Sequence, residues 1–194
     1  MNIEDSKKPS LFGVSRSGGT FIYNIVHEIF AGNIREQSHD FFKTNRKVIA
    51  TYRDFRDSTV SWWRMVDGQF DSENNKKMMS IIDILVYAVR MQERINELEK
   101  MRIYYPEEQI LFLRYEDFFN NFEFIFHKLE HFLDIQITPK LKKMIIQKYN
   151  LAAQKEEAAK FEDFKGYDQV RHIHGHHIMN GRPQTWMKLT DPKH

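Results

Sequence analysis

A glycine-rich loop near the start of the chain has the residue types and spacing that bind phosphate. Residues 13–20 read GVSRSGGT and lie between a short apolar run, 10–14, and a segment of helical periodicity, 21–30. Glycines let the backbone turn tightly around an oxyanion, and the N–H groups at a helix start attract negative charge. The loop predicts a phosphate site, although a tight strand-to-helix turn without a ligand explains the same glycines.

The same loop argues against a kinase or another ATP-dependent enzyme. Gly13, Gly18 and Thr20 fit the nucleotide-triphosphate pattern GxxxxGK[ST], but Gly19 occupies the lysine position. Kinases and NTPases use that lysine to hold the terminal phosphates, so its replacement disfavours ATP as the ligand. Arg16 could place a cation inside the loop instead.

A second anion site is predicted after the apolar run 48–52. Arg53 follows this run, and Ser61 lies eight residues further on, near the start of a predicted helix. An arginine can direct two N–H groups at one phosphate, and a serine hydroxyl can donate a third hydrogen bond. Three charged residues between them are expected to be helix caps or surface ion pairs: Asp54, Arg56 and Asp57.

Regular secondary structure must bring these two sites together. The runs 10–14, 48–52 and 110–113 have strand length, and each precedes a segment with apolar residues at helical spacing. That alternation predicts an α/β fold with a central parallel sheet flanked by helices, which brings both anion sites to one edge of the sheet. Further helices are expected over 81–101, 122–133, 140–149 and 151–161.

Length and composition limit the remaining possibilities. We expect one domain over 1–194, with a polar lead-in over 1–9 and a looser C-terminal segment over about 166–194. The net charge of +2 gives no reason to expect a nucleic-acid partner. The sequence has no cysteine, which excludes disulfides and suits a reducing compartment. Because no long apolar run follows the N-terminus, we expect no signal peptide or membrane anchor, and a cytoplasmic location.

Four segments together resemble one enzyme family. Residues 15–21 (SRSGGTF) resemble the 5′-phosphosulfate loop of sulfotransferases that use 3′-phosphoadenosine 5′-phosphosulfate (PAPS), and residues 52–64 (YRDFRDSTVSWWR) resemble their 3′-phosphate motif. Residues 110–118 (ILFLRYEDF) are similar to the next strand and turn of that family, and residues 177–186 (HIMNGRPQTW) to its closing loop. The resemblance implies a P-loop-like fold, PAPS as sulfuryl donor, 3′-phosphoadenosine 5′-phosphate (PAP) as product, and no metal.

The resemblance also implies a role for each matched residue. Arg16 corresponds to a lysine that contacts the 5′-phosphosulfate, while Arg53 and Ser61 correspond to the pair that holds the 3′-phosphate. Phe21 and Tyr115 correspond to residues at the adenine. The other implied nucleotide contacts come from the glycine-rich loop and the closing loop: Ser17, Gly18, Gly19, Thr20, Gly181 and Arg182.

Transfer to a hydroxyl group also requires a base. A histidine can accept a proton near neutral pH, and His39, within the QSHD of residues 37–40, resembles the turn that carries the family's catalytic histidine. We therefore expect His39 to act as the base and Arg16 to stabilise the leaving group. Three neighbours could replace His39 in that role: Glu36, Asp40 and Lys43.

Several alternatives stay open at this point. The histidines of residues 172–177 invite a zinc site, but no carboxylate lies among them, and a solvated loop is the favoured interpretation. Trp62 and Trp63 could pack the core or line an acceptor pocket. The acceptor could be a small molecule, a carbohydrate or another hydroxyl or amine compound, and no dimerisation motif is recognisable. A small kinase and a catalytically inactive PAP- or PAPS-binding module are the competing functions.

Overall fold

A parallel sheet forms the centre of the protein. The computed structural model describes residues 8–32, 34, 37–40, 42–69, 81–162, 166–175, 181–184, 186 and 187. Within these residues the sheet has four strands in the order β2-β1-β3-β4, and all neighbouring strands are parallel. The strands are β1 (Ser10–Gly13), β2 (Gln37–Ser38), β3 (Val48–Tyr52) and β4 (Ile110–Arg114). The expected α/β fold with a central parallel sheet is therefore confirmed.

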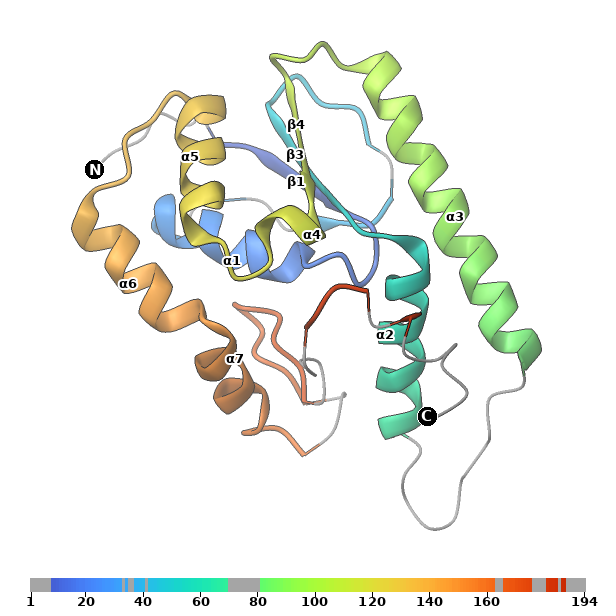
Figure 1. The fold of residues 1–194 in the computed structure, drawn as a ribbon. Helices are drawn as coiled ribbons and strands as arrows, with labels where there is room; N and C mark the ends of the chain where they lie inside the picture. The colour runs from blue at the N-terminus through green and yellow to red at the C-terminus, as the bar shows by residue number, and fades with distance from the viewer. Residues whose placement is uncertain are drawn as a thin grey trace.

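Helices cover both faces of this sheet (Figure 1). They are α1 (Gly19–Ile29), α2 (Phe55–Gln69), α3 (Ile81–Tyr104), α4 (Tyr115–Phe118), α5 (Phe122–Leu133), α6 (Pro139–Tyr149) and α7 (Leu151–Ala158). Leu11 points into a buried cluster with side chains of α1, α5 and α6, whereas Phe12 points into a second cluster with side chains of α3. Alternate residues of a strand face opposite sides, so one short apolar strand supplies both cores.

The last helix ends earlier than the expected range of 151–161. After Ala158 the backbone continues in tighter turns, in which the N–H of Lys160 donates to Glu157 O and that of Phe161 to Ala158 O, both at 3.2 Å. Bonds between residues three apart are common where an α-helix ends, which explains why the helical pattern extends further than the helix.

The register of the sheet aligns the carboxyl ends of its two central strands. Gly13 of β1 lies opposite Thr51 of β3, and Tyr52 of β3 lies opposite Arg114 of β4. The segments that follow these strands therefore begin at the same edge. In open parallel sheets this edge is where ligands bind.

The glycine-rich loop turns sharply from β1 into α1. Gly18, the residue before α1, has a φ angle of 76°, a left-handed conformation that side chains with a Cβ atom disfavour. A Cβ atom on Gly18 would also lie 2.8 Å from Tyr115 Cδ2 and 2.9 Å from Phe118 Cζ. The glycine is thus required both by the backbone and by the close approach of α4.

The substitution Gly18→Ala tests this double requirement. We expect it to lower the free energy of unfolding by about 2–4 kcal/mol, from the left-handed backbone and from overpacking together. Gly32→Ala is the matched control, because Gly32 has a φ angle of 82° but its added Cβ would meet nothing closer than 3.4 Å. Urea unfolding of both variants measures the difference, and equal losses would contradict a steric contribution at Gly18.

Candidate functional site

The glycine-rich loop is held against the neighbouring strand by a buried pair of hydroxyl groups. Ser17 Oγ and Thr51 Oγ1 are 2.8 Å apart, and Ser17 is 0% exposed. The N–H of Ser17 also donates to Val14 O at 3.1 Å. Gly19 and Thr20 form the first turn of α1, which has no side-chain cap. The loop therefore directs the amide groups of a helix start towards the carboxyl edge of the sheet.

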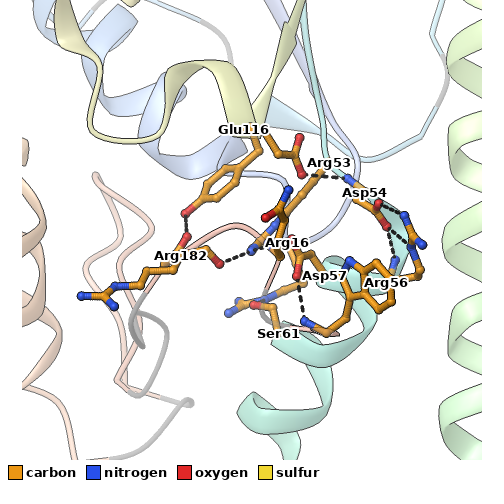
Figure 2. A network of polar contacts seen from close by, with 12 residues as sticks. Arg16, Arg53, Asp54, Arg56, Asp57, Ser61, Glu116 and Arg182 are labelled. Carbon is orange, nitrogen blue, oxygen red and sulfur yellow. Dashed lines mark hydrogen bonds and ion pairs between the residues drawn. The ribbon is translucent and has the colours of Figure 1, made fainter. Parts of the chain in front are cut away.

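Arg16 reaches from the loop across to α2. Its Nε donates to Ser61 Oγ at 3.2 Å and its Nη1 lies 3.5 Å from Met65 Sδ. Burial, more than the nearby positive charge of Arg53, lowers the pKa of Arg16 to about 10, so the group stays cationic at neutral pH. The two segments that the sequence predicted as anion sites are thus in direct contact (Figure 2).

Arg53 lies deeper, at the end of β3, and is only 5% exposed. Its Nη2 donates to Arg182 O at 3.0 Å and lies 3.6 Å from Asp57 Oδ2, and its guanidinium carbon is 4.2 Å from the centre of the Tyr115 ring. The buried Nε has no hydrogen-bond partner among the described residues. A buried donor without a partner is costly, so this N–H is suited to an incoming acceptor.

Tyr115 joins the site to the C-terminal part of the chain. Its hydroxyl donates to Gly181 O at 2.6 Å, and burial raises its pKa. Gly181 has a φ angle of 65°, and a Cβ atom there would lie 2.8 Å from Phe119 Cε2. Arg182 contributes its carbonyl oxygen to Arg53, while its side chain extends away from Arg16 and Arg53 (Figure 2). The structure thus brings residues 181 and 182 to the predicted site.

The expectation for Asp57 is wrong. Asp57 is 1% exposed instead of lying on the surface, and it accepts hydrogen bonds from the N–H groups of Gln184 (2.6 Å) and Trp186 (3.2 Å). Asp54 and Arg56 do form the expected cap and ion pair, with Asp54 Oδ1 accepting from Arg56 N at 2.9 Å. The signal that sequence reasoning missed is the spacing of four residues from Arg53 to Asp57, which lets Asp57 in the first turn of α2 face the arginine that follows β3.

His39 lies at the end of β2, beside the start of the loop. Its Nδ1 is 2.5 Å from Gly13 O, and because a carbonyl oxygen can only accept, Nδ1 carries the proton. The ring therefore keeps Nε2 as its basic nitrogen. Of the alternative bases, Asp40 pairs with Arg94 at 2.9 Å and Lys43 lies over the Tyr104 ring at 4.7 Å, so both contact α3. Glu36 lies outside the described residues.

Two aromatic residues that the sequence analysis discussed, Phe21 and Trp62, pack against other rings. Phe21 lies 6.1 Å from Phe118 and 5.6 Å from Phe122, measured between ring centres. Trp62 stacks on Tyr87 of α3 at 3.9 Å, which supports the packing interpretation for this tryptophan. Histidines 176 and 177 lie outside the described residues, and within the described part no group of three or more His, Cys, Asp or Glu side chains could hold a metal ion.

Comparisons with known proteins point to one family. The family described as "Sulfotransferase domain" matches residues 33–193, a range that begins after the glycine-rich loop. A search of curated proteins finds no match. None of the described helices is both long enough and apolar enough to cross a membrane.

Several solved structures share the fold. Mouse sulfotransferase SULT7A1 complexed with PAP aligns with a TM-score of 0.67 at 14% identity, covering 98% of this chain and 81% of the other. Retinol dehydratase with androsterone and PAP aligns with a TM-score of 0.64, and with retinol and PAP with 0.65, both at 13% identity. These alignments cover 99% of this chain and 78% and 79% of the dehydratase. Because the family match spans well over half of its length, the chain belongs to the sulfotransferase domain family.

Proposed function

We propose that this sulfotransferase transfers the sulfuryl group of PAPS to a hydroxyl or amine acceptor. The observation that carries the proposal is the convergence of Arg16 and Arg53 from two strand ends, with Ser61 of α2 in contact with Arg16. Two neighbouring positive charges that are partly withdrawn from solvent repel one another and favour a ligand with two anionic groups. PAPS has such a pair, with the phosphosulfate on its 5′ side and the phosphate on its 3′ side.

The donor fits the residues in a defined orientation. The amide groups of Ser17, Gly18, Gly19 and Thr20, together with Arg16, would hold the 5′-phosphosulfate. The N–H groups of Arg53 and the hydroxyl of Ser61 would hold the 3′-phosphate, with Gly181 and Arg182 closing over it. Phe21 and Tyr115 would lie at the adenine. The PAP bound in the similar solved structures supports this choice of nucleotide.

The reaction proposed for this site is an in-line displacement at sulfur. The acceptor oxygen or nitrogen forms a new bond to sulfur, and the bond from sulfur to the bridging phosphate oxygen breaks with its electron pair leaving on PAP. His39 Nε2 takes the acceptor proton. Arg16 stays charged throughout, so it stabilises the leaving oxygen electrostatically and donates no proton to it. A cytoplasmic location remains our proposal, based on the absence of cysteine.

Calorimetric titration with PAP in EDTA is the first test. We expect metal-independent binding of PAP and much weaker binding of AMP, which lacks the 3′-phosphate. ATP with Mg²⁺ is the third titrant, because preference for ATP with no binding of PAP would support the kinase and contradict the proposed donor.

The variant Arg53→Lys tests the 3′-phosphate site without removing the charge that balances Asp57. Lysine cannot reproduce the planar fork of arginine, so we expect PAP affinity to fall by roughly tenfold or more and AMP affinity to change little. Arg114→Lys is the matched control, since Arg114 ends the neighbouring strand β4 but is exposed and pairs with Glu116. Equal effects of the two substitutions would contradict the assignment of Arg53.

The variant His39→Asn separates binding from turnover. Asparagine can still donate to Gly13 O but has no basic nitrogen, so we expect turnover to fall by about 10²–10⁴-fold with PAP affinity unchanged. His131→Asn, on the exposed side of α5, is the control. If turnover persists in His39→Asn, another residue acts as the base. If the wild-type protein binds PAP but turns over no acceptor, the inactive binding module is supported.

A further inference from the structure

A buried carboxylate lies beside the proposed donor site and has no part in the proposed chemistry. Asp57 is 1% exposed, and its oxygens accept from the N–H groups of Gln184 and Trp186 and face Arg53 (Figure 2). Burying a carboxylate costs several kcal/mol unless hydrogen bonds and an opposite charge compensate it. The donors that compensate Asp57 belong to residues 127 and 129 positions later in the chain.

These donors belong to a segment that we call the strap, residues 181–184, 186 and 187. Its other contacts go to the same neighbourhood: Gly181 O accepts from Tyr115, and Arg182 O accepts from Arg53. The guanidinium of Arg56 lies 3.9 Å from the centre of the Trp186 ring. The strap therefore contacts Tyr115 and Arg53 at one described end, and Asp57 and Arg56 near the other.

The contact with Asp57 also holds a strained part of the strap. Gln184 has a φ angle of 59°, a left-handed conformation that costs a residue with a Cβ atom about 1 kcal/mol or more. Its N–H donates to Asp57 at 2.6 Å, a charge-assisted bond of the strong class. The carboxylate thus stabilises a backbone conformation that the sequence of the strap does not favour by itself.

Asp57 constrains Arg53 as well. Arg53 Nη2 lies between Asp57 Oδ2 (3.6 Å) and Arg182 O (3.0 Å), and with this nitrogen held, the guanidinium cannot rotate freely. Its Nε, which has no partner among the described residues, is then kept in one direction. Arg16, in contrast, contacts Ser61 and Met65 of α2.

We propose that Asp57 is a positioning residue that sets the affinity of the protein for the 3′-phosphate of its nucleotide. It acts through two partners, the strap and the guanidinium of Arg53, and touches neither the nucleotide nor the acceptor. This inference rests on the proposed function, because it takes Arg53 and the strap as the 3′-phosphate site. The role predicts a selective effect. Removing the carboxylate weakens the binding of nucleotides that carry a 3′-phosphate and leaves the binding of nucleotides without one unchanged.

The experiment compares PAP and AMP titrations of the wild type, Asp57→Asn and the control Asp117→Asn. Asparagine keeps one acceptor oxygen but loses the charge and one of the two N–H bonds, so we expect PAP binding to weaken by roughly 10–100-fold with AMP binding unchanged. In turnover assays KM for PAPS rises while kcat at saturating PAPS is retained. Asp117 is exposed on α4, so its substitution is expected to change neither titration.

A second variant keeps the buried charge and changes only its position. Asp57→Glu retains a carboxylate beside Arg53 but moves its oxygens by one methylene relative to the two N–H groups of the strap. We expect the same selective loss of PAP affinity with AMP binding unchanged, and this variant carries the test if Asp57→Asn fails to fold.

The outcomes separate the two proposals. If the wild type fails to bind PAP more tightly than AMP, the proposed donor site is wrong and the inference fails with it. Suppose instead that the wild type binds PAP selectively, but that Asp57→Asn weakens the binding of PAP and AMP to the same extent, or changes neither. The positioning role is then overturned and the donor site stands. A selective loss of PAP in both variants supports the role of Asp57.

Discussion

The close approach of two guanidinium groups is the constraint on which the rest of the site depends. Arg53 is buried and Arg16 is half-buried, and burial together with the positive charge of Arg53 lowers the pKa of Arg16 to about 10. Like charges so placed repel one another unless negative groups compensate them. Asp57 provides one such group at 3.6 Å from Arg53. An anionic ligand with two charged ends would provide the others, which is why the geometry favours a bisphosphorylated nucleotide.

The sheet imposes this approach on the two arginines. β1 and β3 are hydrogen-bonded with Gly13 opposite Thr51, and the Ser17–Thr51 contact continues the attachment beyond the strands. The segments that carry Arg16 and Arg53 therefore begin side by side at the carboxyl edge of the sheet, and they cannot separate without breaking buried hydrogen bonds. Helix α2 then returns Ser61 to Arg16. Backbone pairing thus holds in place an electrostatic arrangement that would be unfavourable in a flexible chain.

Much of the fold was predictable because its signals are local. β3 has the expected bounds, and β1 and β4 differ from the expected runs by one residue each, since buried parallel strands must be apolar along their length. β2 spans only Gln37–Ser38 and has no apolar run, so its pattern is weak. The family suggested by the four motifs is confirmed by the match over residues 33–193. The roles of the individual site residues and the single-domain assignment stay predictions.

The sequence by itself determined the three apolar strands and the helices that follow them, and where a glycine is needed in the glycine-rich loop. These features depend on side-chain hydrophobicity and backbone sterics within a few neighbouring residues. The tertiary structure alone decided that Asp57 is buried, that His39 donates through Nδ1 to Gly13 O, and that Arg53 meets the carbonyl of Arg182. Each of these depends on a partner far away in the chain, 127 positions for Asp57 and Gln184, and no local pattern specifies which distant backbone group will satisfy a buried charge.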